Sequence, residues 1–152
     1  MPNLCPECGA ILKENSSCQA IFDSVLALEF TDPAYSEVHM LTVACFMIQH
    51  GRYSDEALAW IEQKLRENLE RGISAEQIRQ EAMHETGLHK RTWKVIRQPG
   101  TSPQPKIAWS MTIAGVATNY QDASTYCELV RKWARITLAE MQPLIRLMDN
   151  QA

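Results

Sequence analysis

The chain has 152 residues, of which 45% are hydrophobic and 22% charged, and its formal net charge is −3. This composition fits one globular domain with its own core, and the negative charge offers no overall attraction to nucleic acid. The longest apolar run, 43–48, is far shorter than a membrane span, and no apolar signal segment follows Met1. We therefore expect a cytoplasmic protein and exclude the membrane and secreted classes.

Apolar periodicity, capping residues and helix-ending glycines predict a mostly helical chain after an irregular start, where Pro2, Pro6 and Gly9 interrupt any helix. Helices are predicted over residues 18–30, 33–50, 54–71, 74–86 and 122–148. The second carries apolar residues around nearly its whole circumference, so we expect it to lie at the centre of the fold. Pro143 should kink the last helix or split off its final turn.

The segment before the last helix is the least regular part of the prediction. Four helix-breaking residues make 98–106 a loop: Pro99, Gly100, Pro103 and Pro105. Residues 107–116 are compatible with a short strand or with an extended lead-in to a helix. The predicted class is therefore all-α, a compact bundle of about five to six helices. We expect a zinc-binding knuckle over 1–17 to pack on a single helical domain over 18–152.

Three of the five cysteines fall in the first eighteen residues, in Cys5-Pro6-Glu7-Cys8-Gly9 and at Cys18. A Cys-x-x-Cys turn brings two thiolates to one metal ion, and Cys18 offers a third sulfur after a short loop. The alternatives are a redox motif, against which the neighbouring prolines argue, and incidental thiols. Because Zn²⁺ takes four ligands in a tetrahedron, usually Cys or His, we predict bound Zn²⁺ and a fourth ligand elsewhere.

The fourth ligand is predicted by treating the first two helices as an antiparallel hairpin that turns at residues 31–32. Cys18 lies about thirteen residues before that turn, so its neighbours should be near residues 45–50. His50, at the helix end beside Gly51, fits best. His39 is the alternative, although it lies closer to the turn, and Cys45 is third because its apolar context indicates a core residue.

At these residues the chain resembles an uncharacterised bacterial family defined only as a domain of unknown function. Three segments carry the resemblance. The first is Cys5-Pro6-Glu7-Cys8-Gly9, the second starts at Cys18 and runs through Phe30-Thr31-Asp32-Pro33-Ala34-Tyr35, and the third is Val38-His39-Met40-Leu41-Thr42-Val43, leading to Gln49-His50-Gly51. In that family an acidic residue typically follows the Thr-Val pair, and a proline follows the Gln-His pair. Here Ala44 and Gly51 stand at those positions. The resemblance implies a zinc-bearing helical fold and implies no established activity.

A basic segment follows the fourth predicted helix. Lys90, Arg91, Lys94 and Arg97 surround Trp93, which suggests an anion-binding patch with an aromatic platform for stacking. The simpler interpretation is a solvated polar face. A single basic segment without a recognition fold is weak support for nucleic-acid binding.

Three functional hypotheses remain. The favoured one is a zinc-stabilised helical accessory or adaptor protein that binds another protein, of the kind often found in bacterial regulatory or defence operons. The second is a nucleic-acid-binding regulator that uses the basic segment 88–106. The third is a zinc-dependent hydrolase with His39 as the acid–base group. We expect no enzymatic activity, because three thiolates and His50 would fill the coordination sphere and Ala44 provides no carboxylate base.

Overall fold

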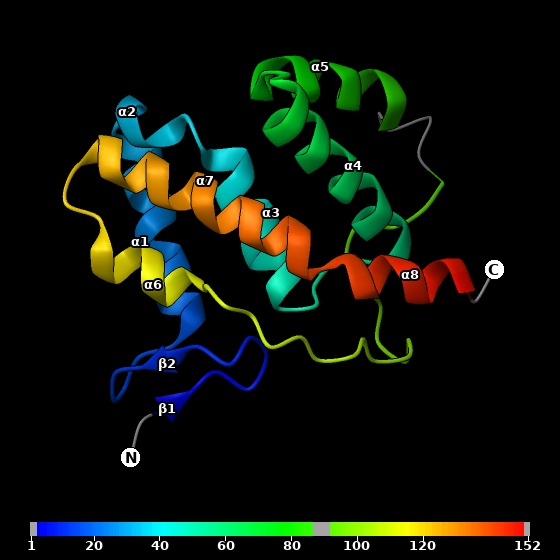
Figure 1. Cartoon of the computed structure of the whole chain (residues 1–152), viewed down its shortest axis with the longest axis horizontal. Coiled ribbons are helices and arrows are strands. Elements are labelled where there is room, and N and C mark those ends of the chain that lie inside the picture. The colour runs from blue at the N-terminus through cyan, green and yellow to red at the C-terminus, as the bar shows by residue number, and fades with distance from the viewer. Residues whose placement is uncertain (1–2, 87–91, 151–152) are drawn as a thin grey trace.

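Two packed helices, α3 (His39–Gln49) and α7 (Ala123–Glu140), form the centre of the computed structural model, which describes residues 3–86 and 92–150 (Figure 1). Helix α3 also contacts α1 (Cys18–Thr31) and α4 (Asp55–Arg71). The three largest fully buried side chains, Trp133, Tyr126 and Phe46, lie on α7 and α3. The predicted all-α class and the central position of the second predicted helical region are confirmed.

The helix predicted over 33–50 is divided into α2 (Pro33–Ser36) and α3. Asp32 ends α1 and caps α2, since its carboxylate accepts a hydrogen bond from the Ala34 N–H at 3.0 Å. Val38 then leaves the helical conformation, with φ −105° and ψ 14°, and buries its side chain. The chain turns at Val38 because α2 packs on α1 and α7 while α3 continues into the core. The apolar pattern runs across this turn and therefore did not reveal it.

Helix α4 and helix α5 (Ala75–Thr86) form an antiparallel pair on one side of α3 (Figure 1). Ser54 caps α4 by accepting a hydrogen bond from the Ala57 N–H at 3.1 Å, as its sequence position predicted. Gly72 follows α4 with a positive φ of 71°, which allows the chain to reverse into α5. Helix α4 thus has the two ends that its capping residues predict.

Residues 92–112 form an irregular segment, with a turn at residues 98–101, that lies along the outside of the bundle. The Ser54 N–H donates to the Val95 carbonyl and the Arg97 N–H to the Arg52 carbonyl, each at 2.8 Å. A short helix, α6 (Ile113–Asn119), follows and packs on α1 and α7. The region 107–116 is therefore an extended lead-in followed by the start of a helix, which is one of the two predicted possibilities.

Helix α7 begins at Asp122, whose side chain and Thr125 form a reciprocal capping box. It ends at Glu140, and α8 (Gln142–Asn150) continues the chain after Met141. Pro143 thus lies in the first turn of a separate helix, as the sequence suggested. Within the described residues, no helix has the length and apolar character needed to cross a membrane.

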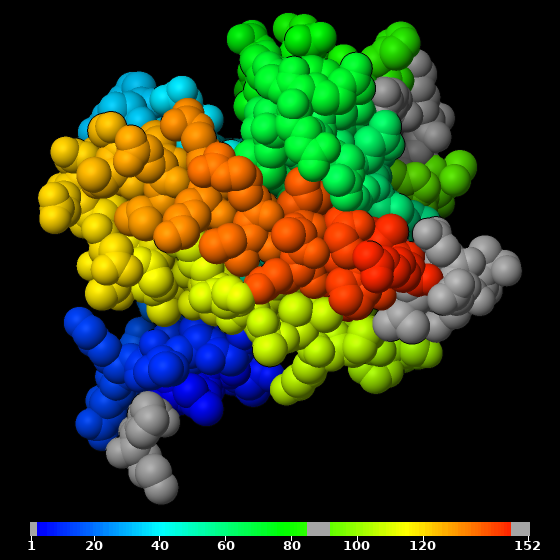
Figure 2. Space-filling view, in the orientation of Figure 1, coloured from blue at the N-terminus to red at the C-terminus, as the bar shows by residue number. Residues whose placement is uncertain are grey.

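A two-stranded hairpin of β1 (Asn3–Leu4) and β2 (Ile11–Leu12) lies at the N-terminal end of α1, below the bundle in Figure 1. In the space-filling view this region, coloured blue, forms a lobe at one corner of the molecule (Figure 2). Its inner residues are buried against the bundle, so the hairpin contributes to the same core.

Candidate metal centre

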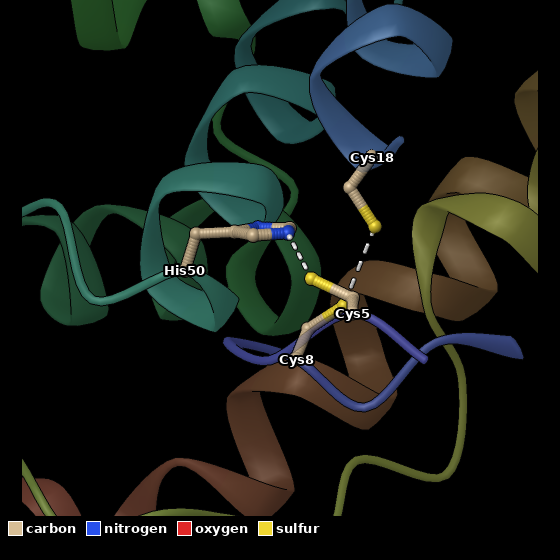
Figure 3. A group of neighbouring side chains, drawn as sticks. All are labelled: Cys5, Cys8, Cys18 and His50. Atoms are coloured by element: carbon tan, nitrogen blue, oxygen red, sulfur yellow. Dashed lines mark hydrogen bonds between the residues drawn. The ribbon is translucent and has the colours of Figure 1, made fainter. Parts of the chain in front are cut away.

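The loop between β1 and β2 brings the first two cysteines together. The Gly9 N–H donates to the Cys5 carbonyl at 2.9 Å, and the Cys5 N–H donates to the Ala10 carbonyl at the same distance. Gly9 has a φ of 79°, a conformation in which a residue with a side chain is strained. The tight turn therefore requires the glycine that follows Cys8, and it points both sulfurs toward the bundle (Figure 3).

The other two side chains come from the ends of helices. Cys18 is the first residue of α1, whose N-cap Ser17 accepts a hydrogen bond from the Ala20 N–H at 3.1 Å. His50 is the C-cap of α3 and has left the helical conformation, with φ −101° and ψ 7°. Because α1 and α3 are antiparallel neighbours, the beginning of one meets the end of the other. Cys18 and His50 consequently face the hairpin loop (Figure 3).

Four ligand atoms meet at this point: the sulfurs of Cys5, Cys8 and Cys18 and a ring nitrogen of His50 all lie within 4.8 Å of one another. The Cys8 and Cys18 sulfurs are 3.6 Å apart, and Cys5 Sγ is 3.7 Å from His50 Nε2. A disulfide needs about 2.05 Å between sulfurs, so these cysteines are not bonded to each other. All four residues are buried. This group could hold a metal ion.

The ring of His50 is oriented by its own helix. Its Nδ1 lies 2.7 Å from the Phe46 carbonyl oxygen, so Nδ1 carries the proton and donates it. Nε2 is therefore the unprotonated nitrogen, and it faces Cys5. The ring also stacks on Phe46 with centroids 4.1 Å apart. These contacts hold the imidazole in the tautomer and orientation that a metal ligand needs.

The pKa values of these side chains reflect burial and local hydrogen bonds. Burial raises the pKa of the Cys8 thiol, and burial together with the nearby Cys8 raises that of Cys18. Burial also acts to raise the pKa of Cys5, but backbone N–H groups of Cys8 and Glu7 outweigh it and the net direction is downward. Burial lowers the pKa of His50, which favours the neutral imidazole that binds metals.

Two contacts attach the knuckle loop to the rest of the chain. Arg52 forms a bidentate ion pair with Glu7, with nitrogen–oxygen distances of 2.9 and 3.3 Å. The Lys106 ammonium donates to the Pro6 carbonyl at 2.7 Å. The Glu7 carboxylate balances the charge of Arg52, whereas the Lys106 ammonium brings positive charge that offsets part of the negative charge of the thiolates in a metal-bound state.

The two other predicted candidates for the fourth ligand lie elsewhere. His39 is at the opposite end of α3 and forms a hydrogen bond with Glu29, with 2.7 Å between Nδ1 and Oε1. Cys45 is fully buried in the bundle, where burial raises its pKa to about 12. Neither belongs to the group around Cys18.

The predicted anion-binding residues are only partly described. Lys90 and Arg91 lie outside the described residues, and the Lys94 side chain is exposed. Arg97 is turned inward: its guanidinium donates to Asp55 at 2.8 Å and to the Ser102 carbonyl at 2.6 Å. Arg97 therefore attaches the segment 92–112 to the start of α4.

One group of polar residues was not predicted from the sequence. Glu29 is buried and accepts hydrogen bonds from His39, Thr42 and Tyr126. A signal was present, since Glu29 stands four residues after Val25 and so falls on the apolar face of α1. A carboxylate at such a position needs polar partners, and only the packing of α3 and α7 on α1 reveals them.

Comparison with known families gives one match: a model described as a family of unknown function (DUF5946) covers residues 3–142. No curated protein and no solved structure matches the chain. The family match extends over the knuckle, α1 to α7 and the start of α8.

Proposed function

The chain belongs to the DUF5946 family, whose function is unknown, and from this premise we propose that it is a cytoplasmic, zinc-stabilised accessory protein that acts by binding another protein. The proposal also includes the prediction that the protein acts as part of a regulatory or defence operon. The observation that carries it is the buried group of three cysteines and one histidine, which can fill a tetrahedral metal site completely.

Zinc is the metal that these donors suit best. Zn–S bonds of about 2.3 Å and a Zn–N bond of about 2.0 Å in a tetrahedron separate two sulfurs by roughly 3.8 Å and sulfur from nitrogen by roughly 3.5 Å. Two of the six separations among the four ligand atoms, at 3.6 and 3.7 Å, are close to these values, and all six lie within 4.8 Å. Soft thiolates with one imidazole also select zinc over magnesium, calcium or manganese. Zinc with four protein ligands stabilises a fold and has no position for a reacting water.

Metal analysis tests the zinc part of this proposal. Protein purified under reducing conditions should contain about one zinc per chain, and Cys8→Ser and His50→Ala should each lower this content strongly. Cys127→Ser is the matched control, because that thiol is buried but contacts the Ala34 carbonyl, away from the site. Zinc-free wild-type protein, or equal zinc in the His50 and Cys127 variants, would contradict the assignment.

The knuckle also offers a surface for a protein partner. Leu4 and Ile11 are cross-strand neighbours in the β1–β2 hairpin, and they are 56% and 72% exposed. Two large apolar side chains next to each other on a hairpin that a bound metal would hold rigid suit a protein-binding surface. The proposed role of the metal is therefore to fix this hairpin so that its outer side chains can be recognised.

A photo-crosslinking experiment tests the accessory role. A photoreactive amino acid at position 11, in the cells that naturally produce the protein, should give an adduct that is absent when it replaces the exposed residue Glu14. The captured partner should then bind the purified wild-type chain at least about tenfold more tightly than Ile11→Glu. No adduct beyond the Glu14 control, or equal binding by Ile11→Glu with full zinc, would contradict the proposal.

The two other hypotheses have less support. A regulator that binds nucleic acid would need a free basic surface, but Arg97 is already paired with Asp55. A zinc hydrolase would need an open coordination position, and four side chains are available to close it. We expect no metal-dependent turnover of esters, phosphodiesters, nucleosides or peptides. Turnover abolished by His39→Ala in a folded protein would reverse this ranking.

A further inference from the structure

A second polar cluster joins three helices at the end of α3 opposite the candidate metal centre. Glu29 of α1 accepts hydrogen bonds from His39 Nδ1 at 2.7 Å and from the Thr42 hydroxyl at 2.6 Å, both residues of α3. The hydroxyl of Tyr126, from α7, donates to the same carboxylate. The Glu29 side chain is completely buried, whereas that of His39 is 40% exposed. The cluster thus has an inner carboxylate and an outer imidazole.

The hydrogen bonds determine which ring nitrogen of His39 can face a ligand. Tyr126 keeps its proton, because burial and then the hydrogen bond to Glu29 raise its pKa. Glu29 therefore accepts from Tyr126, Thr42 and His39, which uses both of its oxygens. With Nδ1–H committed to Glu29, a neutral His39 presents Nε2 as a hydrogen-bond acceptor. Within the part of the chain that the structure describes, no hydrogen bond involves His39 Nε2.

His39 lines a cavity of about 610 Å³ between α3 and the α4–α5 pair. This volume lies within the range of roughly 300–1,000 Å³ that is usual for small-molecule sites. Its wall is largely apolar and includes Phe30, Met40, Val43, Tyr53, Trp60 and Ile61. Figure 1 shows α5 across the molecule from the β1–β2 hairpin. None of the four candidate metal ligands lines the cavity.

The charges around the cavity favour a neutral ligand. Glu37, Glu76 and Arg79 also line it, so its border carries both signs of charge. Glu37 already forms an ion pair with Arg131, at 3.0 Å. The buried Glu29 carboxylate would oppose an anion placed against His39. An apolar body with one weak hydrogen-bond donor satisfies both the walls and the imidazole.

We propose that this cavity is a binding site for a small neutral molecule with an aromatic or branched aliphatic body and one O–H or N–H group. The body contacts the apolar walls, and the O–H or N–H group donates to Nε2 of His39. Glu29 acts as a positioning residue, because it holds the ring through Nδ1 and keeps Nε2 available. This site adds a ligand to the proposed accessory protein and does not depend on the identity of the metal.

A matched pair of probes tests the hydrogen bond. The zinc-loaded full chain is titrated calorimetrically with 4-tert-butylphenol and with 4-tert-butylanisole, which has the same body but no O–H. We expect the phenol to bind at least about tenfold more tightly, since the anisole would leave Nε2 without a partner. The phenol should also shift the ¹⁵N resonance of His39 Nε2. Equal affinities, or no saturable binding of either probe at millimolar concentration, would overturn the proposal.

Two variants locate the site independently of His39. Ala82 lines the cavity from α5, whereas Gln80 is exposed on the same helix and does not line it. Ala82→Trp should fill the cavity and weaken phenol binding at least about tenfold, and Gln80→Trp should change it less than about twofold. Circular dichroism and zinc content show that both variants are folded. Undiminished binding by folded Ala82→Trp would place the probe elsewhere and contradict the proposal.

Discussion

Cys8 and Cys18 link metal binding to proton release. Their thiols have raised pKa values in the metal-free protein, so both carry protons at neutral pH. A metal binds the thiolates, so each metal ion should displace at least about two protons, and the apparent affinity should fall at least about a hundredfold for each unit that the pH falls. Calorimetry in buffers of different ionisation enthalpy measures the number released. A pH-independent affinity would show that these thiols are not ligands.

A mutation tests the energetic role of the buried Glu29 cluster. Tyr126→Phe removes one donor to the carboxylate and leaves the ring in place, so we expect it to lower the free energy of unfolding by about 1–3 kcal/mol. Tyr120→Phe is the matched control, because the Tyr120 ring contacts Tyr126 but the Tyr120 hydroxyl is not among the groups that donate to Glu29. Urea unfolding curves measure both. Equal stabilities would show that the hydroxyl of Tyr126 contributes nothing.

At the scale of elements, the hairpin and the helices should respond differently to metal removal. The short strands β1 and β2 are too small to be stable alone, whereas α3 and α7 bury a large apolar core. We expect chelation to abolish the hydrogen-exchange protection of residues 3–17 first, with protection retained in α3 and α7. Exchange measured by mass spectrometry resolves these segments. Cooperative loss of protection in all of them would mean that the metal stabilises the entire fold.

Two of the basic residues in the segment 92–112, Lys94 and Arg97, have different roles. Lys94 is exposed, so Lys94→Glu should change the free energy of unfolding by less than about 0.5 kcal/mol. Arg97 bonds to Asp55 and to the Ser102 carbonyl, so Arg97→Glu should cost more, about 1–3 kcal/mol. Thermal or urea unfolding measures both changes. Equal small effects would show that Arg97 does not attach this segment to α4.

At the scale of the whole molecule, charge predicts weak interaction with nucleic acid. The chain carries −3 overall, and Arg97 is engaged within the protein. We expect no binding of duplex DNA or single-stranded RNA at physiological salt, as measured by fluorescence anisotropy. The nucleic-acid binding of the wild type is compared with that of the Lys94→Glu variant. Micromolar binding by the wild type that is lost in this variant would favour the regulator hypothesis over the accessory protein.

Local sequence patterns determined much of the fold and part of the site. Ser54, Gly72, Asp122 and Pro143 predicted where helices begin, end or divide, because capping and backbone restriction act over a few residues. The Cys-x-x-Cys turn predicted a metal-binding loop for the same reason. The resemblance to a family of unknown function is confirmed by the match over 3–142.

Only the tertiary structure decided which distant side chains meet. The sequence left His50, His39 and Cys45 open as partners of Cys18, since helical periodicity does not fix how two helices are offset and rotated. Packing of α1 against α3 brings His50 to the knuckle and His39 to Glu29 at the other end. The Glu29 cluster and the cavity beside it likewise depend on contacts among several helices. Neighbouring residues in the sequence determine short-range hydrogen bonds such as helix caps. Contacts between distant residues instead depend on how whole helical faces are buried against each other.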